Sequence, residues 1–405
     1  MFNYHAYLGH RKGWRAAALA VAALLLAAAA IVAELGRRDR KSAAPNAPIR
    51  ARSKLPAKRG ADAATGRPVS LRPAKRVRVA LDPDDVRRAL DKVRLHHPAS
   101  LSILLHYAMV FGLDAPVPGY RSPDERPTVA ALLYDGDLSR AYFQDRPVFV
   151  RTAGGLANRV RIASDAHWQI ERQAHPGQLL AALARQGVPL ARKLSVGDDV
   201  FSVEDILADA TANFDRDAPQ IEWTAAALAM YLPPRKDWFD QHGRRCSFDD
   251  LATELLRRDV RSRELSCAGI HVLEALVLLL RVDERYGILS SVQRQRTREY
   301  LGRHVAGLTK TQADDGGWSI NWSDTTKVRP DVAPHTMGHQ RVHVTGHHVD
   351  WMLMLPADMM PSQDVFDRAA AWLLASLLGW DQANLTNTYC PYSHAAHVIK
   401  TLTAE

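Results

Sequence analysis

The chain has 405 residues, of which 47% are hydrophobic and 24% charged, so most of it can fold around an apolar core and wholesale disorder is excluded. Its net charge of +9 comes from residues 1–78, which hold 17 of the 53 Lys and Arg but only three of the 44 Asp and Glu, leaving a net charge of about −5 for residues 79–405. A mildly acidic folded part argues against nucleic acid as a partner, and three cysteines cannot all pair with one another.

The first predicted element is an apolar segment near the N-terminus. Residues 16–33 contain neither a charge nor a proline, and at ~1.5 Å per residue they just span a hydrocarbon core of ~30 Å. We predict a transmembrane helix over residues 16–35, preceded by a short basic tail over residues 1–15, with the lipid bilayer as a partner. A cleaved signal peptide is the alternative, but the apolar run is longer than the usual core of such a peptide.

A basic linker follows this segment. Residues 36–78 are rich in Arg, Lys, Ala and Pro, lack aromatic residues and show no apolar period, which predicts a disordered tether. The cations after the apolar segment favour a cytoplasmic domain, whereas an early basic-then-apolar segment is typical of exported proteins. We favour export, which predicts a single-pass protein of the cell membrane with an extracytoplasmic domain.

Residues 79–405 are predicted to form one all-α domain. Apolar residues recur there at spacings of three and four in windows that Pro and Gly separate. Strand signals are confined to Arg146–Arg151 and Lys327–Arg329, and a short hairpin is allowed within residues 113–165. The predicted helical windows are Asp84–Arg94, Ser100–Phe111, Gly177–Gln186, Val203–Ala212, Glu222–Tyr231, Phe248–Arg257, Cys267–Arg281, Ser291–Lys310, Gly346–Leu355, Asp364–Leu378 and Ser393–Leu402.

The start of the first window contains a motif with two interpretations. Asp82-Pro83-Asp84-Asp85 spells the DxDD of class II terpene cyclases, in which an aspartic acid protonates the substrate. Its place before an amphipathic run favours a helix start instead. Asp82 is then the N-cap and Pro83 the first helical residue, and the two following acids lie at the positive end of the helix dipole.

The most specific motif lies at the end of a predicted helix. The segment from Gln312 to Trp318, with the sequence QADDGGW, resembles the QW repeat of the terpene cyclase and protein prenyltransferase superfamily. In that superfamily the Gln caps a helix end and stacks on the Trp, so the motif serves the fold. The resemblance covers about residues 165–402 and implies an α/α toroid, an incomplete or divergent barrel of helical hairpins. Such a fold does not by itself imply a reaction.

Cysteine and histidine recur at predicted helix starts. Cys267 and His271 are four positions apart, as are Cys390 and His394, so each pair lies on one face of its helix; His348 lies at a third start. Thiolates and imidazoles are zinc ligands. Prenyltransferases and lanthionine cyclases, which this architecture resembles, use such ligands at the mouth of the toroid. These five residues are therefore candidate zinc ligands, with capping or packing roles as the alternative.

Aromatic and acidic side chains accompany a run of histidines in the region 312–351 and suggest a substrate cavity, with polar loop filling as the alternative. The predicted cavity residues are Trp318, Trp322, Trp351, His339 and His343. The predicted acid–base residues are His271, His348, Asp315 and Asp350.

Two classes of function follow from these patterns. The first is a zinc-dependent or acid–base enzyme that acts on a lipid, isoprenoid or glycan substrate. The second is a non-catalytic scaffold that binds a ligand or a protein at the membrane. Convergence of Cys267, His271, His348 and Cys390 or His394 around one cavity would favour the zinc enzyme.

Overall fold

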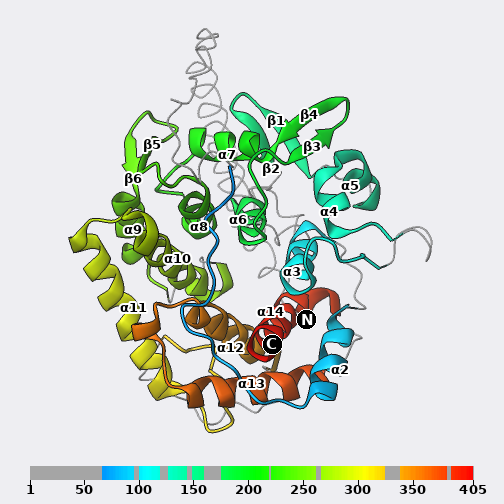
Figure 1. The fold of residues 1–405 in the computed structure, drawn as a ribbon, viewed down its shortest axis with the longest axis vertical. Helices are drawn as coiled ribbons and strands as arrows, with labels where there is room; N and C mark the ends of the chain where they lie inside the picture. The colour runs from blue at the N-terminus through cyan, green and yellow to red at the C-terminus, as the bar shows by residue number, and fades with distance from the viewer. Residues whose placement is uncertain are drawn as a thin grey trace, which may run out of the picture. The chain divides into compact units, whose positions relative to one another are not determined.

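The computed structural model describes residues 66–94, 100–118, 126–143, 148–158, 175–218, 220–260, 266–323, 338–380 and 385–404. These residues are mostly helical (Figure 1). The helices are α2 (Pro83–Arg94), α3 (Leu101–Phe111), α4 (Val129–Tyr134), α5 (Gly136–Tyr142), α6 (Gln178–Arg185), α7 (Val203–Ala212), α8 (Ile221–Tyr231), α9 (Phe248–Arg257), α10 (Ile270–Tyr286), α11 (Ser291–Thr311), α12 (Gly338–Leu353), α13 (Gln363–Leu378) and α14 (Leu385–Thr403), with 3-10 turns η3 (Ser266–Gly269) and η4 (Ala357–Met359).

Three antiparallel hairpins complete the described part of the chain. Each consists of two short strands and lies beside the helices rather than among them (Figure 1). The hairpins are β1 (Phe149–Thr152) with β2 (Gly155–Asn158), β3 (Lys193–Val196) with β4 (Asp199–Ser202), and β5 (Asp237–Phe239) with β6 (Arg245–Ser247). Their registers pair Phe149 with Asn158, Lys193 with Ser202 and Asp237 with Ser247.

Six of the described helices pack into a closed ring (Figure 1). In order around the ring these are α3, α6, α8, α10, α12 and α14, and α14 packs in turn against α3. Other helices cover the ring from outside: α7 packs on α6 and α8, α9 and α11 on α10, α13 on α12 and α14, and α2 on α13 and α14. The interior of the ring is therefore lined by residues from six separate helices.

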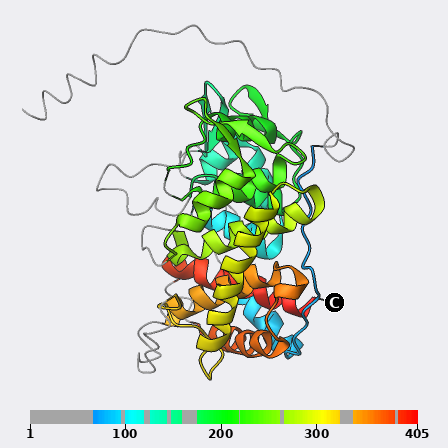
Figure 2. The same ribbon diagram turned by 90° about the vertical axis from the view of Figure 1, so that its left-hand side faces the viewer.

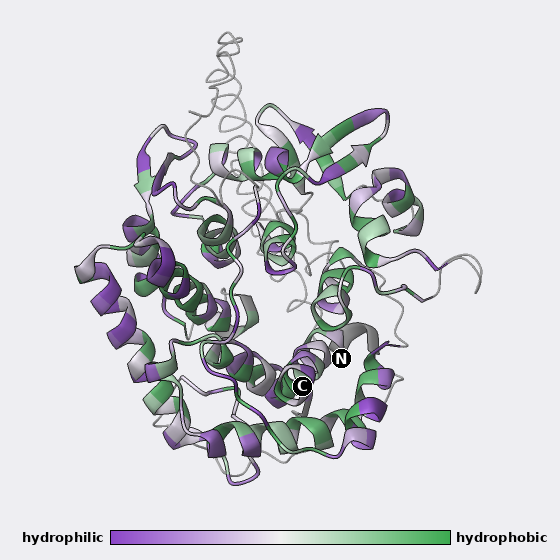
Figure 3. Ribbon diagram, viewed as in Figure 1, coloured by the Kyte–Doolittle hydropathy of each residue, from purple (hydrophilic) through white to green (hydrophobic). Residues whose placement is uncertain are grey.

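The difference between ring and outer helices follows from their sequences. In α10 nearly every residue from Ile270 to Asp283 is buried, because neighbours surround the helix on several sides. In α11 the buried positions, such as Thr297, Leu301 and Val305, recur every four residues and form a single stripe. Figure 3 shows the same contrast, with α11 largely hydrophilic and α10 largely hydrophobic.

An extended segment crosses the helices before α2. The backbone N–H of Val69 donates to Met230 O at 2.8 Å at the end of α8, and that of Val79 donates to Leu402 O at 3.2 Å near the end of α14. The side chains of Val69 and Val77 are buried. Figure 2 shows this segment along one side of the helices. The described chain thus begins inside the segment that was predicted to be a linker.

Two local predictions about helix ends can be compared with the structure. Helix α2 begins at Pro83, and the Asp82 carboxylate accepts the backbone N–H groups of Asp84 and Asp85 at 3.0 and 2.9 Å, so the N-cap interpretation is confirmed. At the other motif, Gln312 caps the end of α11 and its Nε2 donates to Val365 O at 3.0 Å, which connects α11 to α13.

The predicted fold class and location need correction. No helix among the described residues is long and apolar enough to cross a membrane. The predicted span at residues 16–35, the tail before it and the linker as far as residue 65 lie outside the described residues. The single-pass membrane and extracytoplasmic predictions are overturned and are not carried forward. The described residues are mostly helical, as predicted, but they also contain three hairpins.

Each predicted helical window coincides with a helix, but two starts are misplaced. Helix α12 begins at residue 338 rather than 346, and α14 begins at residue 385 rather than 393. The short helices α4 and α5 were missed, and only the hairpin of β1 and β2 falls where a hairpin was allowed. The strand candidate Lys327–Arg329 lies outside the described residues.

Candidate functional site

Metal-ligating side chains converge inside the ring, contributed by α3, by η3 with α10, by α12 and by α14. They form three overlapping groups, and within each group the candidate ligand atoms all lie within 4.8 Å of one another. We call these seven side chains the Cys/His cluster: His106, Cys267, His271, His343, His347, Cys390 and His394.

The local structure explains why these side chains point to a common centre. Cys267 lies in the turn η3, directly before α10, and His271 lies near the start of α10. His343 and His347 in α12, and Cys390 and His394 in α14, are each four positions apart within one helix. Residues at this spacing lie one above the other on one helix face. Three neighbouring parts of the ring therefore each present two ligands.

The closest fit to a metal ion is the group of Cys267, His343, His347 and Cys390. A tetrahedral zinc ion with Zn–S bonds of ~2.3 Å and Zn–N bonds of ~2.0–2.1 Å holds its ligand atoms about 3.3–3.8 Å apart. Ligand atoms within 4.8 Å of one another therefore need only small side-chain movements to surround such an ion. The two thiols are free.

A close approach of two helices brings the groups together. Gly346 in α12 faces α14, where a Cβ on the glycine would lie 3.1 Å from Ala395 N and 3.2 Å from His394 Cβ. The missing side chain thus lets His347 stack on His394 with ring centroids 3.5 Å apart.

Outer hydrogen bonds fix the orientation of several cluster rings. His271 Nδ1 donates to Glu274 Oε2 at 2.6 Å, and His347 Nδ1 donates to His343 O at 2.8 Å. The opposite nitrogens, Nε2 of His271 and His347 as well as Nε2 of His343, are buried without a hydrogen-bond partner among the described residues. Metal-bound histidines have this arrangement, in which one ring nitrogen is held and the other faces the ion.

The electrostatic environment favours the metal-binding form of several ligands. The hydrogen bond with Cys267 and the nearby His106 and His271 rings hold the pKa of Cys390 well below its usual range, despite burial. Burial lowers the pKa of His347 well below that of a free imidazole. Burial also lowers the pKa of His271, but Cys267 and Glu274 outweigh it and raise the pKa well above the ordinary value.

A charged network borders the cluster. Arg185 at the end of α6 pairs with Glu274 at 2.5 Å and lies 3.9 Å from Asp350. Asp350 in turn lies 3.4 Å from His394 Nδ1 and 3.6 Å from His397 Nε2. The buried carboxylates therefore have both an arginine and histidines beside them, which offsets the cost of burying their charges.

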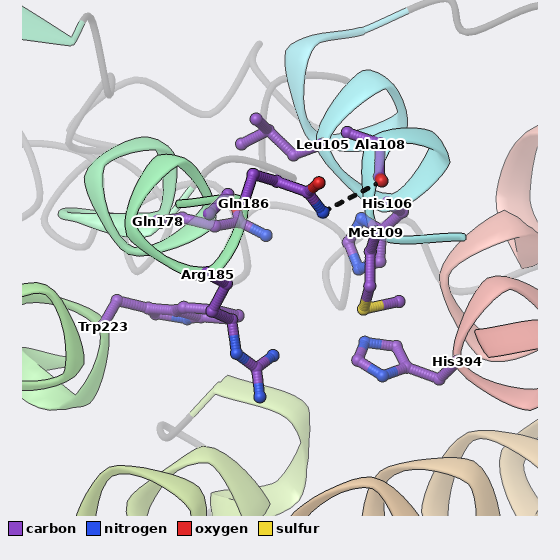
Figure 4. Close-up of a pocket in the computed structure, with 10 residues that line it drawn as sticks. Leu105, His106, Ala108, Met109, Gln178, Arg185, Gln186, Trp223 and His394 are labelled. Carbon is purple, nitrogen blue, oxygen red and sulfur yellow. Dashed lines mark hydrogen bonds between the residues drawn. The ribbon is translucent and has the colours of Figure 1, made fainter. Parts of the chain in front are cut away.

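A small cavity of about 40 Å³ adjoins the cluster. His106 and His394 form part of its wall, and Gln178, Arg185 and Trp223 are also among the lining residues (Figure 4). The two histidines belong to the Cys/His cluster, so the cluster borders open space on this side.

The structure places His348 apart from the cluster. Its ring is fully buried, accepts the indole N–H of Trp351 at Nδ1 over 3.1 Å, and makes edge contacts with Trp318 and Trp322. Burial lowers the pKa of His348 well below its ordinary value. The three tryptophans predicted to line a cavity therefore pack around a histidine, and none of them lines the cavity beside the cluster.

The remaining predicted site residues fall into two sets. His271, Cys267, Cys390, His394 and His343 are brought together in the cluster, with Asp350 beside it. Asp315, by contrast, pairs with Arg341 at 2.7 and 2.8 Å and accepts the Gly317 backbone N–H, while His339 is exposed at the start of α12.

Sequence reasoning missed His106 as a candidate ligand and did not single out His347 within the run of histidines. It also missed Glu274 and Arg185 as charged neighbours of the cluster. A signal for His347 was present, because His343 and His347 show the four-residue spacing of the two Cys–His pairs. A signal for His106 was its isolation in the apolar helix α3. The Arg185 contact depends on ring closure, which local sequence does not reveal.

Comparison of the chain with protein-family models, with curated proteins and with solved structures finds no match. The resemblance to the terpene cyclase and prenyltransferase superfamily thus stays a prediction that rests on one motif. The chemistry of the site has to be argued from its own residues.

Proposed function

We propose that the chain is a zinc-dependent hydrolytic enzyme whose metal centre is the Cys/His cluster. The observation that carries this proposal is the group of Cys267, His343, His347 and Cys390, whose four ligand atoms lie within 4.8 Å of one another in the ring interior. Two sulfur and two nitrogen ligands suit zinc, whereas magnesium and calcium prefer oxygen.

Stability alone does not account for the cluster. The ring already encloses an extensive apolar core, so a metal ion is not needed as a substitute for hydrophobic burial. Buried imidazoles and thiols also cost free energy when they lack partners. Buried polar groups at the edge of a cavity, with shifted pKa values, are typical of a functional site.

Each residue has a distinct role in this proposal. Cys267, His343, His347 and Cys390 would hold the ion, whose positive charge would stabilise negative charge that develops on the substrate. His271 acts as the general acid through Nε2, because Cys267 and Glu274 raise its pKa and Glu274 holds its Nδ1 over 2.6 Å. The Arg185 pair fixes the Glu274 carboxylate.

A non-catalytic zinc protein is the second candidate. One observation favours it: four protein ligands complete a tetrahedral ion and leave no position for a substrate, as in structural zinc sites. The ion would then connect η3, α12 and α14.

Metal analysis of the purified full chain tests zinc binding. Cys390→Ser should lose zinc, while Cys246→Ser is a matched control, because Cys246 is also a free thiol but lies in β6 outside the cluster. A chain without zinc, or a Cys390→Ser variant that keeps the wild-type zinc content, would contradict the proposal.

Turnover separates the enzyme from the non-catalytic protein. The zinc-loaded chain should hydrolyse 4-nitrophenyl acetate or bis(4-nitrophenyl) phosphate, and His271→Gln should slow this at least about 100-fold with zinc retained. Equal rates for the wild type and His271→Gln would favour the non-catalytic role.

A further inference from the structure

We infer that the cluster binds a second zinc ion between His106, Cys390 and His394, with the thiolate of Cys390 shared between the two ions. This inference rests on the proposed zinc centre and adds a second ion to it. The three ligand atoms lie within 4.8 Å of one another and come from α3 and α14. His106 and His394 are outside the four-ligand group, so they are free to hold an ion of their own.

The orientation of His106 supports this site. Its Nδ1 donates to Ser102 O at 2.7 Å, which leaves Nε2 for an ion, and the ring is hydrogen-bonded to Cys390. The ring also meets His394 edge-on, with centroids 5.3 Å apart. One nitrogen held by a carbonyl and the other facing a thiol is the usual arrangement of a histidine that binds a metal.

The surroundings of His394 give independent support for the second zinc site. Its ring is 2% exposed, and both ring nitrogens lack a hydrogen-bond partner among the described residues. Asp350 Oδ2 lies 3.4 Å from Nδ1, close enough to accept that N–H after a small movement. Nε2 would then bind the ion, and the carboxylate would orient the ring.

Ligand chemistry decides how the overlapping groups can be filled at once. A thiolate sulfur has several lone pairs and can bind two ions, whereas a neutral imidazole has one free nitrogen. Sharing Cys390 therefore lets the four-ligand group and the second site fill together. An ion in the third group, with His271, His347 and His394, would compete with the first site for His347.

The second site differs from the first in having an open side. Three protein ligands leave a tetrahedral zinc ion one position for another molecule, which is the pattern of catalytic zinc sites. His106 and His394 both line the small cavity, so this position faces open space (Figure 4). The first ion then has all four positions filled by protein ligands, whereas the second has one open position that a small ligand can reach.

Zinc stoichiometry of the full chain tests the inference. Metal-free chain titrated with zinc and dialysed should retain two zinc ions, and His106→Gln should retain one. His397→Gln is the matched control and should retain two, because His397 also lies on α14 near Asp350 but belongs to none of the three groups. His271→Gln should also retain two.

The outcomes separate this inference from the proposed function. No zinc on the wild type overturns both, whereas one zinc on the wild type overturns the second site and leaves the first. Two zinc ions on both the wild type and His106→Gln, with one on His271→Gln, would assign the second ion to the third group.

Cobalt substitution gives a readout that does not depend on any variant folding. In the fully cobalt-loaded wild type, azide should change the visible absorption of the cobalt, because the open position accepts it. The chain loaded with one cobalt ion should not respond. An azide-insensitive spectrum at full loading would overturn the open site.

Discussion

At the scale of single residues, adjacent histidines have opposite surroundings. His347 belongs to the Cys/His cluster, whereas His348 is enclosed by Trp318, Trp322 and Trp351. Successive side chains of a helix point about 100° apart, so His347 can face a metal centre while His348 packs between helices.

This pair allows a matched substitution experiment. His347→Ala should weaken zinc binding at least about 100-fold, since even the loss of an outer partner of a ligand costs 10- to 100-fold. His348→Ala should keep zinc but lower the free energy of unfolding by about 2–4 kcal/mol, because it leaves a cavity and an unpaired Trp351 N–H. Zinc titration and denaturant unfolding measure the two effects. If His348→Ala lost zinc and His347→Ala kept it, His348 rather than His347 would be the zinc ligand.

A second residue-scale prediction concerns stability in acid. Burial lowers the pKa of His304 from 6.5 to about 4, where its ring lies between Tyr300 and Trp322. The unfolded chain therefore takes up a proton below about pH 6.5 that the folded chain refuses until about pH 4. The free energy of unfolding should fall over that interval, and His304→Phe should reduce the fall by roughly 1–2 kcal/mol.

Denaturant unfolding at several pH values measures this difference. The comparison with the wild type removes the contribution of zinc ligands, which lose their ion in acid in both proteins. His242→Phe is the control for the substitution itself, because His242 is an exposed histidine outside this aromatic contact. Parallel curves for the wild type and His304→Phe would contradict the prediction.

Part of the site could be predicted from single residues and their spacing. The Cys–His pairs at 267–271 and 390–394 follow from a period that sequence displays directly, and the structure brings both into the cluster. Which of His347 and His348 faces the cluster depends on how α12 is rotated about its own axis, and its packing against neighbouring helices sets that rotation. His106 offers only an isolated polar residue in an apolar helix, and its partners lie far along the chain.

At the scale of elements, helix interiors were easier to predict than helix starts. Gly346 and Pro391 have the properties of helix breakers, yet both lie inside helices. Gly346 is inside α12 because α14 approaches too closely for a side chain, with Ala395 N 3.1 Å from where its Cβ would be. Placing the start of α12 too late hid the pairing of His343 and His347 on one helix face.

The turn between Gln312 and Trp318 gives an element-scale prediction. Gly316 has a φ of +96°, and a Cβ there would lie 2.2 Å from Arg368 O, so Gly316→Ala should lower the free energy of unfolding by about 2–4 kcal/mol. Gly307→Ala in α11 should raise it by about 0.5–1 kcal/mol, because its Cβ would meet open space in a helix.

Thermal and denaturant unfolding measure these two variants. Both should keep the wild-type zinc content, since neither residue belongs to the cluster. Equal stability of Gly316→Ala and the wild type would show that α13 lies farther from this turn than the structure places it.

At the scale of the whole molecule, ring closure brings distant parts of the chain together. Helix α3 packs against α14, and the cluster joins these two helices to α10 and α12. Hydrophobic periodicity predicts each helix but not which helices become neighbours. Closure, and with it the meeting of His106 with Cys390, therefore could not be predicted from local sequence.

Because the ligands come from separate ring helices, zinc should stabilise the ring as a unit. Removal of zinc with a chelator should lower the melting temperature, and added zinc should restore it. At a free zinc concentration 100 times the dissociation constant, the stabilisation is about 2.7 kcal/mol. Differential scanning calorimetry measures the shift, and Cys390→Ser should show none. Identical melting of the chelated and the zinc-loaded wild type would contradict zinc binding by the folded ring.

X-ray absorption at the zinc edge tests the central claim most directly. Bound zinc should show sulfur at ~2.3 Å and nitrogen at ~2.0–2.1 Å. A zinc ion surrounded by oxygen and nitrogen alone in the wild type, or a purified chain that holds no zinc, would contradict the Cys/His cluster as a metal centre.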